Sequence, residues 1–161
     1  IAWAELELAG DDAPAHVQEM VEVRRLLHER QVPSGDSQFG PELVGGFVLG
    51  RDPIDVHAQS LRPAAAMPAL MRSRALTDPD DRMEMMNRLH AVAGFLLRLQ
   101  MSSEGAALHR QPKRSAGGIR MACWDNRMPP AAQAMALLTL EELLSMEDAQ
   151  SMFQEDDPEL Y

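Results

Sequence analysis

The 161-residue chain has little of several residue types that define common protein classes. Its single cysteine, Cys123, cannot form a disulfide within the chain, which favours a reducing compartment such as the cytoplasm. No run approaches the ~20 consecutive apolar residues that a membrane-spanning helix needs. The first residues also lack the basic and then apolar pattern of a secretion signal. The sequence therefore predicts a chain that is not stapled by disulfides and does not span a membrane.

Aromatic residues are also scarce, since the chain has seven of them against twelve Met. With 45% apolar residues, the core must come mainly from Leu, Ala, Val and Met, which is typical of helical proteins. Met side chains adapt to irregular gaps, so a core of this kind can also repack around a partner.

Charge is distributed unevenly along the C-terminal third. Residues 128–161 hold eight acids and no Lys or Arg, whereas residues 105–127 carry a net charge of +4. Such asymmetry usually serves a contact, either within the chain or with a partner. The overall net charge of −10 disfavours general binding to nucleic acid.

The clearest helix start is Thr77-Asp78-Pro79, which combines a capping side chain with a proline suited to the first turn. The apolar spacing predicts a helix from about Pro79 to Met101, with an apolar arc wide enough for a central position. His90 lies in this arc and is expected to be a buried neutral imidazole. Phe95 falls on the polar edge, where it is a candidate for docking a partner.

The segments before this helix are less regular. A first helix is expected from about Pro14 to Arg30, with Arg24 inside its apolar arc, so that Arg24 either reaches the rim or forms a buried ion pair or ligand contact. Residues 31–52 are rich in Gly and Pro and predict a loop region. We therefore predict a mostly α fold, a single domain over residues 1–161 that forms a helical bundle around the helix at 79–101.

The C-terminal segment shows an apolar stripe that changes sides near Ser145. Because Ser145-x-x-Asp148 resembles a capping box, we predict a break there and a short acidic helix that leads into a tail, together residues 146–161. A helix of ~9 residues is not stable alone in water, so it must dock on something. Its candidate contact residues are Met146, Met152 and Phe153.

No catalytic signature is present. The five histidines lack metal-ligand spacing, Cys123 lacks the context of a nucleophile, and the glycines at 45–50 do not form a phosphate-binding loop. The sequence predicts no metal and no cofactor.

The basic loop, residues 110–120, is the strongest binding candidate. Its partner is the acidic tail of the same chain, an external acidic protein or, less simply, nucleic acid. The leading hypothesis is a non-catalytic interaction protein, such as an adaptor, chaperone-like factor or small subunit, that binds another protein or its own oligomer. The alternatives are a regulator that binds nucleic acid through this loop and an enzyme with an unrecognised site. The candidate binding residues of the loop are Arg110, Lys113, Arg114 and Arg120.

Overall fold

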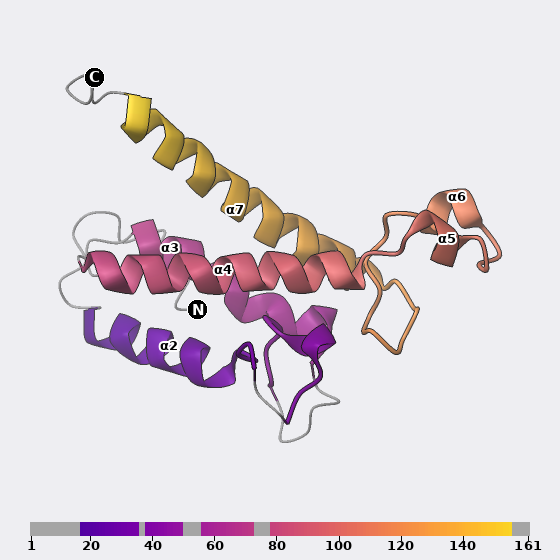
Figure 1. Cartoon of the computed structure of the whole chain (residues 1–161), viewed down its shortest axis with the longest axis horizontal. Helices are drawn as coiled ribbons and strands as arrows, with labels where there is room; N and C mark the ends of the chain where they lie inside the picture. The colour runs from indigo at the N-terminus through magenta and orange to yellow at the C-terminus, as the bar shows by residue number, and fades with distance from the viewer. Residues whose placement is uncertain (1–16, 36–37, 50–55, 73–77, 156–161) are drawn as a thin grey trace.

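The computed structural model describes residues 17–35, 38–49, 56–72 and 78–155, and in these ranges the chain is predominantly helical (Figure 1). This confirms the expected mostly α class. The elements in chain order are α2 (Val17–Arg30), η3 (Pro41–Leu43), η5 (Ala58–Ala65), α3 (Ala66–Arg72), α4 (Pro79–Leu99), α5 (Ser103–Ala106), α6 (Pro112–Ser115) and α7 (Pro130–Glu155). Within the described ranges, no helix is both long enough and apolar enough to cross a bilayer.

Helix α4 begins and ends close to where the sequence predicts. The Asp78 carboxylate accepts a hydrogen bond from the Asp80 amide at 2.9 Å, and Pro79 needs no partner for its missing N–H. The buried face contains residues at spacings of three and four, as a helix with a wide apolar arc requires. These residues are Met85, Met86, Leu89, Val92, Phe95, Leu96 and Leu99.

Two expectations for α4 are wrong. Phe95 is fully buried instead of lying on an exposed polar edge, because the turn at Gly45 and Gly46 packs over that side of the helix. A Cβ on Gly45 would lie 2.0 Å from the Ala91 carbonyl oxygen, so only glycine permits this approach. His90, expected to be buried, is exposed.

The loop before η5 is held by backbone pairing rather than by a strand. The Val32 amide donates to the Gly46 carbonyl at 2.9 Å, and the Val48 amide donates to the Arg30 carbonyl at 2.8 Å. These bonds place the end of α2 against the turn that packs on α4. Within the loop region predicted for residues 31–52, Leu43 and Phe47 enter the core from a buried turn.

Helix α7 is continuous through Ser145, so the predicted break is wrong. The Ser145 hydroxyl donates to the Glu142 carbonyl at 2.9 Å, which satisfies it inside the helix. The helix packs mainly on η5, and its buried stripe starts with small residues that allow a close approach. The stripe comprises Ala132, Ala136, Thr139, Leu143 and Met146, at spacings of four and three.

Candidate functional site

A network of charged side chains joins α2 to α4. Arg24 forms an ion pair with Asp81 and lies 3.6 Å from a Glu84 carboxylate oxygen. Arg88 reaches Glu84 from the other side, with its Nη2 at 3.0 Å. Arg24 keeps 22% of its side chain exposed and Asp81 keeps 36%, so Arg24 forms a partly buried ion pair at the rim, between the two alternatives predicted for it.

His28 lies inside this network. Its Nδ1 is 3.3 Å from Glu84 Oε1, and its Nε2 is buried without a hydrogen-bond partner in the described part of the chain. Burial lowers the pKa of His28, and the positive charge of Arg88 lowers it further. Burial acts to raise the pKa of Glu84, but the hydrogen bond from Arg88 and the neighbouring cations outweigh it and lower that pKa. The imidazole is therefore neutral and the carboxylate ionised at neutral pH.

His28 and Glu84 resemble the general base and orienting carboxylate of an active site, but the imidazole is not accessible to a substrate. A general base must reach the proton that it removes within hydrogen-bond distance, directly or through one water. The buried Nε2 of His28 faces no nucleophile among the described residues. We therefore interpret the network as a structural contact between helices.

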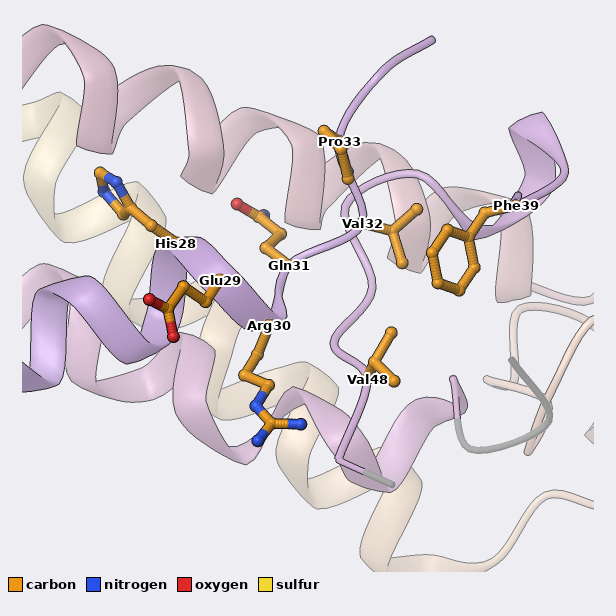
Figure 2. A pocket seen from close by; sticks show the side chains of 8 residues that line it. All are labelled: His28, Glu29, Arg30, Gln31, Val32, Pro33, Phe39 and Val48. Atoms are coloured by element: carbon orange, nitrogen blue, oxygen red, sulfur yellow. The ribbon is translucent and has the colours of Figure 1, made fainter. Parts of the chain in front are cut away.

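A pocket of about 430 Å³ lies beside this contact (Figure 2). The side chains of Val32, Phe39 and Val48 lie close together on one side, whereas those of His28 and Gln31 extend away from them. Gln31 has a structural role, because its side-chain Nε2 donates to the Arg88 carbonyl at 2.9 Å and to the Gly45 carbonyl at 3.3 Å. Since polar groups do not converge on the pocket, its walls fit an apolar side chain better than a reacting substrate.

Residues 101–119 form a separate projection, here called the lobe, at the end of α4 (Figure 1). Its two ends are pinned by backbone bonds, from the Met101 amide to the Gly118 carbonyl at 2.8 Å and from the Gly117 amide to the Met101 carbonyl at 2.9 Å. Gln133 of α7 pairs with both polar backbone groups of Ile119, at 2.8 and 2.6 Å. Met101 and Ala106 are buried inside the lobe. These contacts hold the lobe in one defined orientation.

The basic residues of the sequence divide into two groups in the structure. Arg110, Lys113 and Arg114 are exposed on the lobe, and Lys113 and Arg114 line an open pocket of about 600 Å³ with Gln111 and Pro112. Arg120 instead donates to the carbonyls of the last residues of α4, with its Nη2 2.7 Å from the Arg98 oxygen. A cation is favourable there because the carbonyl end of a helix carries partial negative charge.

Cys123 lies beside this cap. It is partly buried, and its Sγ is 3.7 Å from the Glu42 carbonyl oxygen. Burial raises the pKa of the thiol, which keeps it protonated and poorly nucleophilic at neutral pH.

The acidic helix exposes a different apolar set from the one predicted. Met146 is buried in the core of the chain, whereas Leu137 and Leu144 are 69% and 58% exposed. Glu141, between these two leucines, is also exposed. Met152 and Phe153 belong to α7, but their side chains lie outside the described part of the structure. We call Leu137, Glu141 and Leu144 the outer face of α7.

No protein-family model, no curated protein and no solved structure matches the chain. The surfaces described above are therefore the basis for the functional proposal. In the described ranges, no group of three or more His, Cys, Asp or Glu side chains could hold a metal ion.

Proposed function

We propose that this chain is a non-catalytic protein-interaction component, such as an adaptor, a chaperone-like factor or a small subunit of a larger assembly. In this proposal the helices packed around α4 form a single scaffold, and the partner contacts are α7 and the lobe. The lone cysteine supports a reducing compartment such as the cytoplasm as its location.

The observation that carries this proposal is the outer face of α7. Two leucines seven residues apart lie two helical turns apart on one side, and both are largely exposed. An exposed acid lies between them, which gives the face both apolar area and charge. Faces of this type bind grooves in partner proteins, with the charge setting register and encounter rate.

The exposed cations of the lobe support the same function. Arg110, Lys113 and Arg114 are exposed to solvent, and they fit a negatively charged partner surface. Arg120 supports the function indirectly, because its hydrogen bond attaches the segment that follows the lobe to the end of α4. Met152 and Phe153 remain predicted contacts of the same helix.

The experiment is a co-purification with the tagged full chain. The wild-type chain should retain a partner at fixed stoichiometry, and Leu137→Asp/Leu144→Asp should lose it because charge enters the apolar contact. Met83→Asp/Leu97→Asp is the matched control, since Met83 and Leu97 are 63% and 68% exposed on α4. Equal retention by the α7 variant, or the absence of any stoichiometric partner, would contradict the proposal.

A further inference from the structure

The lobe and the outer face of α7 carry opposite charges. The lobe offers an open pocket with Lys113 and Arg114 in its wall. The outer face offers two projecting leucines on either side of Glu141. An apolar side chain that enters the pocket would bring the neighbouring carboxylate to the two cations.

One chain cannot make this contact with itself through the described residues. Helix α7 begins beside the lobe and runs away from it (Figure 1). The outer face lies about 6 to 17 Å beyond Gln133 along this unbroken helix, in the direction away from the lobe. The bonds between Gln133 and Ile119 fix the lobe at that start, where it extends in the opposite direction. Leu137, only one turn beyond Gln133, is nevertheless 69% exposed.

We propose that the lobe of one copy binds the outer face of α7 in a second copy. This inference names the partner for the two surfaces of the proposed function and so rests on it. Charge complementarity argues for a second copy, because the same chain supplies a basic lobe and an acidic helix that extend in different directions from their junction. From residue 141 onward α7 carries five acids and no basic residue, and the lobe carries three Lys or Arg against one acid.

The net charge of −10 does not prevent this contact. Repulsion between whole molecules is largely screened beyond about 8 Å at physiological ionic strength, whereas ion pairs at a contact are shorter than that. A reciprocal arrangement, in which each copy gives its lobe and receives the other, closes as a two-fold dimer.

The test uses two charge-reversed full-length variants and sedimentation velocity over a range of concentrations. The lobe variant is Lys113→Glu/Arg114→Glu, and the α7 variant is Glu141→Lys/Ser145→Lys, in which all four positions are exposed. The wild type should self-associate, and each variant alone should associate at least about tenfold more weakly. An equimolar mixture of the two variants should associate again, because each lobe then meets an α7 of opposite charge.

Controls separate this proposal from simpler effects. Arg30→Glu/Arg62→Glu changes the net charge by the same amount as the lobe variant, at exposed positions outside the lobe, and should leave self-association unchanged. A wild-type chain that stays monomeric at every concentration, or a mixture that fails to associate, overturns the inference. If a different protein still co-purifies through Leu137 and Leu144, the proposed function stands while the second copy is rejected as the partner.

Discussion

The contact between α2 and α4 and the lobe after α4 use arginine in opposite ways. In the first region, Arg24 and Arg88 meet acids of the facing helix or of their own helix, and little of either side chain is exposed. In the lobe, backbone bonds and Gln133 hold the structure, so Arg110, Lys113 and Arg114 are left in solvent. A basic residue is therefore available to a partner where other groups hold the fold.

Alanine substitutions of one glycine in each region should lower the free energy of unfolding by very different amounts. Gly45→Ala should lower the free energy of unfolding by about 3 kcal/mol or more, because the added Cβ would overlap the Ala91 carbonyl at a φ of +86°. Gly117→Ala in the lobe has a φ of +81° but nothing nearer than 4.0 Å, so it should cost only about 1–2 kcal/mol. Urea denaturation measures both, and equal losses would contradict the close packing of Gly45 on α4.

Each of the two regions is also held by one glutamine, Gln31 beside the α2–α4 contact and Gln133 at the base of the lobe. Gln31→Met should cost about 1–3 kcal/mol, since Gln31 is 5% exposed and its loss leaves the Gly45 carbonyl and the Arg88 guanidinium without this partner. Gln133→Met should cost about 1 kcal/mol and mainly release the base of the lobe.

Hydrogen exchange distinguishes the two glutamine variants. Faster exchange of the Ile119 amide is expected in Gln133→Met while the amides of α4 stay protected. Exchange that rises equally through α4 would show that the lobe and the body unfold together.

The smallest expected effect is a pH dependence specific to the α2–α4 contact. Because the pKa of His28 is lowered from 6.5, the unfolded chain binds more protons than the folded chain between the two pKa values. Stability should therefore fall as the pH drops below about 6.5, by less than about 1.4 kcal/mol per pH unit. The loss of stability that comes from protonating Glu84, whose pKa is lowered from 4.5, begins only at lower pH.

Unfolding free energies measured between pH 7.5 and pH 5 check this dependence. His28→Gln should flatten the slope, whereas His109→Gln in the lobe should keep it. An unchanged slope in His28→Gln would place the responsible proton elsewhere.

The helices with strong local signals could be predicted from the sequence. Pro79 and the capping Asp78 fix the start of α4, since both act through the first turn alone. The burial of Phe95 could not be predicted, because it depends on a glycine turn about fifty residues away in the chain. The roles of Gln31 and Gln133 could not be predicted either, because both side chains bind backbone groups, and backbone groups leave no pattern in the sequence.

The α7 prediction failed for a more local reason. Ser145 and Asp148 fit a capping box, but a serine inside a helix can bond the preceding turn equally well. The small residues Ala132 and Ala136 continue the spacing of Leu143 and Met146, and this pattern would have indicated one continuous helix. Leu137 and Leu144 are large but exposed, so the large residues alone give a stripe that changes sides near Ser145.

The bonds between Gln133 and Ile119 have a mechanical consequence. They join the lobe to the first turns of α7, so a displacement of the start of this helix would carry the base of the lobe with it.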